Sequence, residues 1–307
     1  MDLRDLVTPQ ALLWALVGVL IAVMLVTAST SAAAFSVFNP SWDGASGIQS
    51  TATEEAIETR VALSTAAYSD VSPAGTTALI IGPDETYTES ELTQVRQFVA
   101  AGGTLVVADD FGSGNQILTG LGAETRFDRR LLRDPQNNGP STAMPTATVV
   151  PNASETTSAE TVMLNYGTVL TVENATVLAR SSEFSYLDRD TDGEIDENES
   201  LQSSPVIARE ELGSGTVIVV SDGSLFINAM LERADNQAFT TDLLTGSELV
   251  LLDSTHTSSS PPLQVALVTL RTNAWAQVAI TLLLGVLGYL SPRLWRQRNA
   301  LVPQSGD

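Results

Sequence analysis

Residues 188–199, with the sequence DRDTDGEIDENE, place oxygen-bearing groups at the spacing of a calcium-binding loop. In such a loop, side chains at positions 1, 3, 5, 9 and 12 and the backbone carbonyl at position 7 surround one ion, and a glycine at position 6 makes the sharp turn. The sequence supplies these groups as Asp188, Asp190, Asp192, Asp196 and Glu199, the carbonyl of Glu194, and Gly193. Calcium would hold the loop in shape, because outside the cell even a weak site, with a Kd on the order of 10⁻⁴–10⁻³ M, stays occupied.

The alternative for this stretch is an acidic loop that is simply solvated. Acidic composition alone does not place Gly193, Ile195 and Glu199 in register, so the spacing favours calcium. We expect Ile195, at position 8, to pack. The flanks do not resemble two helices, and residues 184–187 resemble a strand, so we expect a calcium-type loop within another fold.

A second group of candidate residues follows apolar runs that are predicted to be strands. In open parallel sheets, ligands bind beyond the carboxyl ends of the strands. A short helix is predicted at residues 117–121, and the glycine-rich turn before it has amides that suit an anion. The candidate ligand crevice consists of Asp84, Asp109, Asp110, Gly112, Ser113, Gly114 and Asp222.

This crevice has two interpretations. In one, Asp109, Asp110 and Asp222 surround a divalent ion in a metal-dependent hydrolase. In the other, the glycines relieve tight turns and the aspartates are solvated at the rim of the sheet. The crevice lacks the spacing of a nucleotide fingerprint and the lysine of a phosphate loop.

Other catalytic arrangements find no support in the sequence. There is no cysteine, which excludes thiol chemistry, and no lysine, which excludes a Ser–Lys pair. The single histidine, His256, falls in a Ser- and Pro-rich stretch that is predicted to be a tether. We therefore expect a non-catalytic protein.

The elements that position these residues are clearest between residues 76 and 122, which predict strand, helix, strand and helix. Residues 78–81 and 105–108 are short apolar runs typical of strands buried on both faces. Between them, Thr88 and Glu91 form a capping box, and an apolar stripe follows at helical spacing. The predicted fold class is α/β, with a mostly parallel sheet.

Weaker patterns predict the remaining elements. Residues 51–60 resemble a helix with Thr51 and Glu54 as a capping box, and Asp235 is expected to cap a helix that ends at Leu244. Residues 134–160, polar and proline-spaced, resemble an exposed loop. The expected hairpins pair residues 169–172 with 176–179 and residues 205–208 with 216–220, and a last strand is expected at 249–252.

The composition is strongly acidic, with 36 acidic residues and 15 basic residues that are all arginine. Carboxylates retain water, and salt screens the repulsion between them, so this composition is typical of a halophilic protein in molar salt. Nucleic acid is excluded as an expected partner, because a phosphate-binding face needs clustered basic charge.

Two apolar stretches predict membrane spans. Residues 11–28 are uncharged and long enough to cross a bilayer, although a cleaved signal peptide is the alternative. Residues 274–290 are the second, and the arginines after them place the C-terminus in the cytoplasm. The expected organisation is a cytoplasmic N-terminus (1–10), a span (11–34), an extracytoplasmic α/β domain (35–253), a tether (254–271), a span (272–291) and a cytoplasmic tail (292–307).

The motifs NPSWDG, VRQFVAAGGTLVVADDFGSGNQILTGLG, SYLDRDTDGEIDENE and LGSGTVIVVSDGSLFINAML, in this order, resemble the haloarchaeal branch of the domain of unknown function 4350 family. The resemblance covers about residues 37–253. It implies a flavodoxin-like three-layer sandwich similar to class I glutamine amidotransferases, without their Cys–His pair. It also implies a membrane assembly, because relatives often accompany MoxR-type AAA ATPases.

Overall fold

The computed structural model describes residues 9–151, 158–256, 261–263, 265, 266 and 278. The second predicted span and the C-terminal tail lie outside these residues. The chain divides into residues 1–261 and 262–307, and the fold below is that of the first unit.

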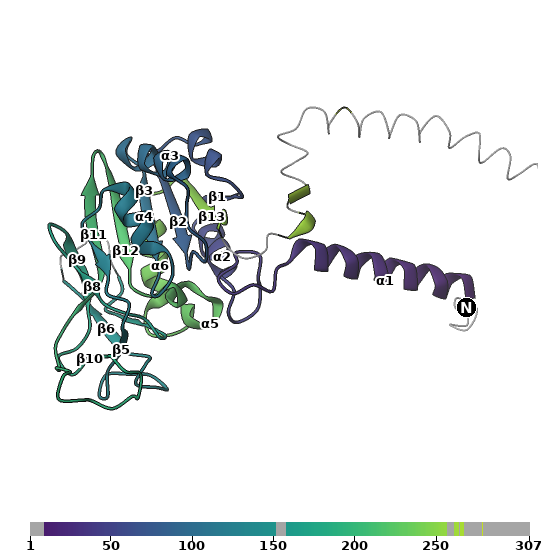
Figure 1. Cartoon of the computed structure of the whole chain (residues 1–307). Helices are drawn as coiled ribbons and strands as arrows, with labels where there is room; N and C mark the ends of the chain where they lie inside the picture. Colours follow the sequence, from purple (N-terminus) through teal and green to yellow (C-terminus); the bar gives the residue numbers. More distant parts are fainter. Residues whose placement is uncertain (1–8, 152–157, 257–260, 264, 267–277, 279–307) are drawn as a thin grey trace, which may run out of the picture. The chain divides into compact units, whose positions relative to one another are not determined.

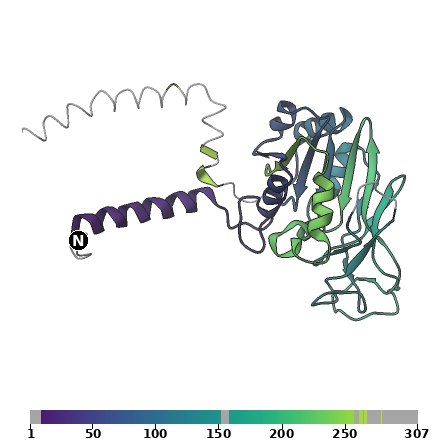
Figure 2. The ribbon, with the colours of Figure 1, turned by 180° about the vertical axis from the view of Figure 1, so that it is seen from behind.

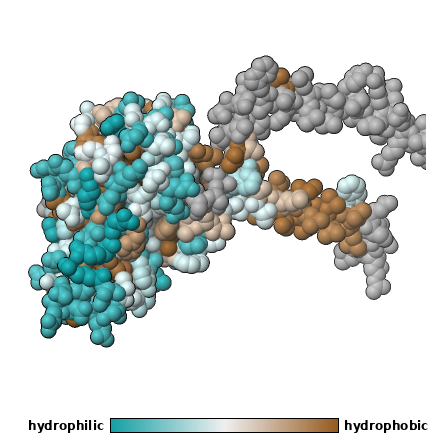
Figure 3. Space-filling view, in the orientation of Figure 1, coloured by the Kyte–Doolittle hydropathy of each residue, from teal (hydrophilic) through white to brown (hydrophobic). Residues whose placement is uncertain are grey.

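Helix α1 (Pro9–Ser29) is apolar along its whole length. The window from Leu12 to Ser29 has a mean hydropathy of 2.5 and no buried residue, and Figure 3 shows its surface as hydrophobic. A helix of 21 residues rises about 32 Å, enough to cross the apolar core of a bilayer. The described part of the chain thus contains one helix that is a candidate membrane anchor or signal sequence.

The sheet has nine strands in the order β1-β13-β2-β3-β12-β11-β9-β6-β7. Its first half is parallel and consists of β1 (Glu58–Ala62), β13 (Leu249–Asp253), β2 (Thr76–Ile81), β3 (Thr104–Ala108) and β12 (Gly215–Val220). Its second half is antiparallel and consists of β11 (Pro205–Leu212), β9 (Thr176–Arg180), β6 (Thr146–Val149) and β7 (Thr161–Met163). The sheet is therefore parallel only in the half that contains β2 and β3, the strands predicted between residues 76 and 122.

Helices cover both faces of the sheet, as the opposite views of Figures 1 and 2 show. One face carries η2 (Thr65–Asp70), α3 (Glu89–Ala100) and α4 (Gly114–Leu121). The other carries α2 (Gly47–Glu54), η3 (Gly223–Phe226), α5 (Asn228–Leu231) and α6 (Asn236–Leu244). The α/β class is confirmed, with one apolar core on each side of the sheet.

Strand β2 shows why the sheet needs both layers. Leu79 and Ile81 belong to one core and Ala78 and Ile80 to the other, because successive side chains of a strand point to opposite faces. All six residues of β2 are buried. An apolar strand of this kind is stable only between two covering layers.

The predicted capping box of α3 is present. The Glu91 amide donates to the Thr88 hydroxyl at 3.4 Å, and the Thr88 amide donates to the Glu91 carboxylate at 2.7 Å. The predicted apolar stripe is buried: Leu92, Val95, Phe98 and Val99. Local sequence therefore determines this helix, from its cap to its packing face.

The capping box predicted for the first helix of the domain is wrong. Helix α2 begins at Gly47 and ends at Glu54, so Thr51 lies inside it and its hydroxyl donates to the Gly47 carbonyl. The packing face formed by Ile48 and Ala52 sets these bounds, because it lies upstream of the expected start.

One hairpin prediction, for residues 169–172 and 176–179, and one loop prediction, for residues 134–160, are also wrong. Strand β8 (Leu170–Thr171) pairs with β4 (Arg126–Phe127), whereas β9 pairs with β11 and β6. Residues 134–160 contain β6, with Ala143 and Ala147 fully buried. These pairings join segments far apart in the sequence, so local turn signals did not reveal them. The predicted hairpin of β11 and β12 is confirmed.

Asp235 does not cap α6 as expected. No cap hydrogen bond forms, and its carboxylate instead accepts the amides of Glu160 and Thr161, at 3.1 and 3.0 Å. The loop before β7 (Thr161–Met163) offers these two amides to the same carboxylate, and this holds the edge of the sheet against α6.

Both ends of the domain lie at the carboxyl edge of the parallel strands. The Phe35 ring packs so closely on Gly82, at the end of β2, that a Cβ on that glycine would lie 2.6 Å from the ring. At the other end of the domain, the Asp84 amide donates to the His256 carbonyl, and the Ser254 amide to the Ala62 carbonyl. The predicted tether therefore begins later than Ser254, because the chain remains packed on the domain through His256.

Candidate functional site

The predicted calcium loop follows a short two-stranded sheet. Strand β10 (Tyr186–Asp188) pairs antiparallel with β5 (Leu131–Arg133), so Asp188 is held at the end of a strand. The chain then turns sharply at Gly193, whose φ of +80° favours glycine. The expected strand before the loop is present, and the loop lies inside a larger fold as predicted.

The first three predicted ligands converge. Carboxylate oxygens of Asp188, Asp190 and Asp192 all lie within 4.8 Å of one another, the one such group of three in the described part of the chain. The side chain of Glu199 folds back onto the same loop and accepts the Arg189 amide at 2.6 Å and the Asp196 amide at 3.3 Å. The charge of Asp190 raises the pKa of Asp196, as expected where carboxylates crowd together.

The protein itself braces the first ligand position. One oxygen of Asp188 accepts the Thr191 amide at 2.7 Å, and the other accepts the Gly193 amide at 3.2 Å. Arg133 reaches this second oxygen at 2.5 Å, and the ion pair is largely buried. A carboxylate has about four lone-pair sites, so these bonds still leave Asp188 able to bind a cation.

The expected packing of Ile195 is wrong, because its side chain is 50% exposed. In the described part of the chain, no second acidic group of this kind faces the loop to cover position 8. The Glu194 amide donates to Asp192 at 2.8 Å, so the turn keeps its local hydrogen bonds without this contact.

At the carboxyl edge of the sheet, Asp109 already serves as the anion of the glycine-rich turn. Its two carboxylate oxygens accept the Gly112 amide at 3.1 Å and the Gly114 amide at 2.7 Å. A Cβ on Gly114 would lie 2.7 Å from this carboxylate, so only glycine allows the approach. Two of the amides that suit an anion thus already bind a carboxylate of the same chain. The Ser113 hydroxyl is also engaged, because it donates to the carbonyls of Pro83 and Glu85.

Asp222, at the end of β12, has the same kind of role. It is fully buried, and its oxygens accept the Ser224 amide at 2.7 Å and the Asn165 amide at 2.5 Å. Burial raises its pKa to about 8, and the neighbouring charge of Asp110 contributes, while the two amides oppose the shift. Burial also raises the pKa of Asp110 to about 6.

These carboxylates do not assemble a metal centre. Among the described residues, Asp109, Asp110 and Asp222 do not form a group whose ligand atoms all lie within 4.8 Å. Asp84 is exposed, away from the buried pair. Each buried carboxylate braces a loop of its own chain, which is the arrangement expected when a sheet edge is structural.

Sequence reasoning missed a cluster at the end of β13. Buried Asp253 accepts the Tyr68 hydroxyl at 2.8 Å, and the Tyr87 ring contacts the His256 ring at a tilt of 55°, with their centroids 4.3 Å apart. His256 lies 3.2 Å from Glu91 and 3.7 Å from Glu85, and its side chain is only 13% exposed. The single histidine is thus a packed residue that fixes the end of the domain, contrary to its expected place in a free tether.

The fold and the carboxyl edge of the sheet together define a class of protein. It is a mixed α/β domain in which acids at strand ends hydrogen bond to loops of the same chain, and in which both ends of the domain lie at the same edge of the sheet. Residues 37–244 match the family described as Domain of unknown function (DUF4350), and the chain belongs to this family. No curated protein sequence matches the chain.

Solved structures give distant likenesses. The N-terminal domain titled mmIFT52 is 14% identical, with a TM-score of 0.47 over 60% of this chain and 82% of that one. Cytoplasmic protein STM3548 from Salmonella typhimurium is 13% identical, with a TM-score of 0.42 over 66% and 85% of the two chains. Cytoplasmic protein STM1381 from Salmonella typhimurium LT2 is 15% identical, with a TM-score of 0.38 over 66% and 87%. These similarities are too weak to add anything to the family assignment.

The buried acids predict a particular pH dependence of stability. Because the pKa values of Asp110 and Asp222 are raised in the folded state, the folded chain retains protons that the unfolded chain releases. Their contribution to stability is complete below about pH 4 and is lost as the pH rises through about 6 and 8. We expect Asp110→Asn to flatten this loss, because it removes one titrating group and lowers the pKa of Asp222.

The measurement is the melting temperature of the full chain between pH 5 and pH 9. Asp84→Asn is the matched control, since it removes an exposed carboxylate from the same edge. A decline as steep in Asp110→Asn as in the wild type would contradict the coupling of the two acids.

Proposed function

We propose that this chain is a non-catalytic, membrane-anchored binding or scaffold domain. The observation that carries the proposal is the use of the strand-end acids: Asp109 and Asp222 each give both carboxylate oxygens to backbone amides of their own loops. A metal-dependent hydrolase needs carboxylates that converge on one ion, and among the described residues Asp109, Asp110 and Asp222 do not form a group whose ligand atoms all lie within 4.8 Å. The competing proposal of a hydrolase on Asp109, Asp110 and Asp222 lacks that arrangement.

The proposed fold ancestry agrees with a domain that has no active centre. If β13 is counted first and β1, β2, β3 and β12 follow, the spatial order of the parallel strands becomes 2-1-3-4-5, the order of flavodoxin-like sheets. The order would thus be a circular permutation of that fold, related to class I glutamine amidotransferases. The chain has no cysteine, and His256 packs between acidic side chains, so the proposed inheritance includes the fold without the Cys–His chemistry.

We place the domain outside the cell, anchored by both of its ends in the cell membrane. Helix α1 supports the first anchor, and the apolar residues 274–290, followed by arginines, support the second. Both ends of the domain lie at the same edge of the sheet, which suits a domain anchored in one membrane by both ends. The excess of acidic over basic residues suits a surface exposed to high salt.

The absence of cysteine allows a direct test of this topology. We expect Ser90→Cys, in α3, to react with a membrane-impermeant maleimide in intact cells, and Ser305→Cys, in the tail, to react only after permeabilisation. The wild-type chain gives no background, because it has no cysteine. Labelling of Ser305→Cys in intact cells would contradict the cytoplasmic tail, and protection of Ser90→Cys would contradict an external domain.

The proposed partner is a membrane complex that contains a MoxR-type ATPase, on the basis of the family resemblance. We expect the tagged full-length chain, purified from native membranes in mild detergent and high salt, to bring an ATPase or another membrane protein with it in stoichiometric amount. Mass spectrometry identifies what co-purifies. Recovery of the chain alone would argue against an assembly subunit.

We further propose that calcium binds Asp188, Asp190, Asp192, the Glu194 carbonyl, Asp196 and Glu199. The convergence of the first three carboxylates around the Gly193 turn supports this site. The charge of Arg133 opposes a cation next to Asp188, so we expect weak binding of the kind found in extracellular modules. Calcium would also relieve the repulsion that raises the pKa of Asp196.

This site predicts a calcium-dependent gain in stability. A ligand that binds only the folded state stabilises it, by about 2.7 kcal/mol at a hundred times its Kd. We expect the melting temperature of the full chain to rise with calcium relative to chelator, and the rise to disappear in Glu199→Gln, which loses the bidentate position. Glu197→Gln is the control, since it removes an exposed carboxylate from the same loop that is not a predicted calcium ligand. Equal melting with calcium and with chelator would refute the site.

A further inference from the structure

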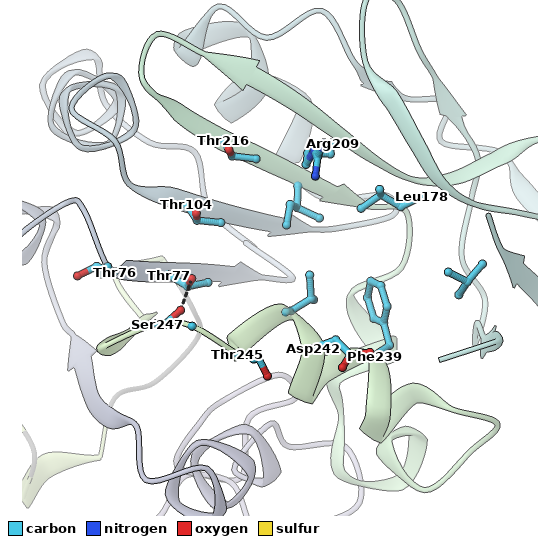
Figure 4. Close-up of a pocket in the computed structure, with 15 residues that line it drawn as sticks. Thr76, Thr77, Thr104, Leu178, Arg209, Thr216, Phe239, Asp242, Thr245 and Ser247 are labelled. Carbon is cyan, nitrogen blue, oxygen red and sulfur yellow. Dashed lines mark hydrogen bonds between the residues drawn. The ribbon is translucent and has the colours of Figure 1, made fainter. Parts of the chain in front are cut away.

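A cavity of about 350 Å³ lies between the sheet and α6, near the amino ends of β2, β3 and β12 (Figure 4). Ligands of open α/β sheets are expected at the opposite, carboxyl edge. The cavity exists because the helices of this face are short, and the antiparallel strands extend the sheet beyond them. Its volume is within the range of small-molecule sites.

The walls of the cavity combine apolar and polar side chains. Val149, Leu178 and Ile218 come from three strands, and the Phe239 ring faces them from α6. At the amino ends of the strands, hydroxyl groups line the cavity, and those of Thr77 and Ser247 bond to each other at 2.7 Å. The arrangement suits a compact organic molecule with an apolar body and a polar end.

Arg209, on β11, is the one basic residue among those that line the cavity. It lies opposite Ile218 in the register of β11 and β12. Its Nε is buried and has no hydrogen-bond partner in the described structure. An ion pair to Glu211, at 3.3 Å from the same atom, is solvent-exposed on both sides and therefore weak.

The acidic residues near Arg209 also have other partners. Glu211 also accepts the Thr216 hydroxyl at 2.8 Å, and Asp242 accepts the Ser158 amide at 2.6 Å. A buried donor without a hydrogen bond in a folded protein calls for an explanation, and here it lies beside a cavity. A guanidinium pairs best with a planar group of two oxygens, such as a carboxylate.

From these observations we infer that the cavity binds a small organic monocarboxylate, with its carboxylate on Arg209 and its apolar body between Ile218 and Phe239. One arginine matches one negative charge, whereas a phosphate ester would bring more charge than this cavity neutralises. The inference names a ligand class for the proposed binding domain. It is independent of the calcium site and of membrane anchorage.

The test uses the full chain in detergent and two probes of the same shape, 4-fluorobenzoate and 4-fluorobenzamide, titrated by fluorine NMR. We expect the benzoate to bind. The uncharged amide should bind more weakly, by roughly tenfold or a larger factor, because it lacks the charge-assisted hydrogen bonds. Arg209→Gln should weaken benzoate binding by about the same factor. Arg233→Gln, which removes an exposed arginine outside the cavity, should leave it unchanged.

Equal binding of the two probes, or unchanged benzoate binding in folded Arg209→Gln, would overturn the inference. Glu211→Gln provides a second test if Arg209→Gln does not fold. Its exposed side chain competes with the ligand for Arg209 and keeps an acceptor for Thr216 as glutamine, so benzoate binding should become tighter. An unchanged or weaker affinity in that variant would also overturn the inference.

Discussion

The closing of the carboxyl edge by the ends of the domain is the constraint on which the structure depends. The Phe35 ring covers the end of β2 at Gly82, and the backbone at His256 hydrogen bonds to Asp84. Between them, buried Asp253 holds Tyr68 by a hydrogen bond of 2.8 Å. In open α/β sheets this edge is the crevice for ligands. Here both ends of the domain pack against this edge, so the edge fixes the path of the chain.

Buried acids acquire a structural role because the chain has few cations. With 36 acidic residues, 15 arginines and no lysine, most carboxylates cannot find a basic partner. Asp109 and Asp222 are satisfied by backbone amides, which stabilise a carboxylate without any added charge. Burial still raises their pKa values. Perturbed acids at strand ends resemble a catalytic centre, but their hydrogen bonds show that they brace loops.

The sequence predicts those parts of the fold that local signals specify. The segment from β2 to β3 was predicted because the capping box of Thr88 and Glu91 and the stripe after it are contiguous. The pairing of β9 with β11 and β6 was missed, since it joins distant segments. The convergence of Asp188, Asp190 and Asp192 follows from their spacing and was predictable. Arg209 was not, because only the tertiary arrangement of α6 and six strands creates its cavity.

The two halves of the sheet divide the proposed tasks between them. The parallel half contains both ends of the domain, whereas the stretch between β3 and β12 contributes the loop at residues 188–199, Arg209 and the antiparallel strands. These halves meet where β12 pairs antiparallel with β11, and β12 pairs on its other side with β3. Asp109 and Asp222 follow β3 and β12, respectively, and each fixes a loop. The antiparallel half also contacts α6 directly, because the Thr161 and Met163 amides donate to Asp235 and Asn236, so a change on binding there has a second path to β13 and the end of the domain.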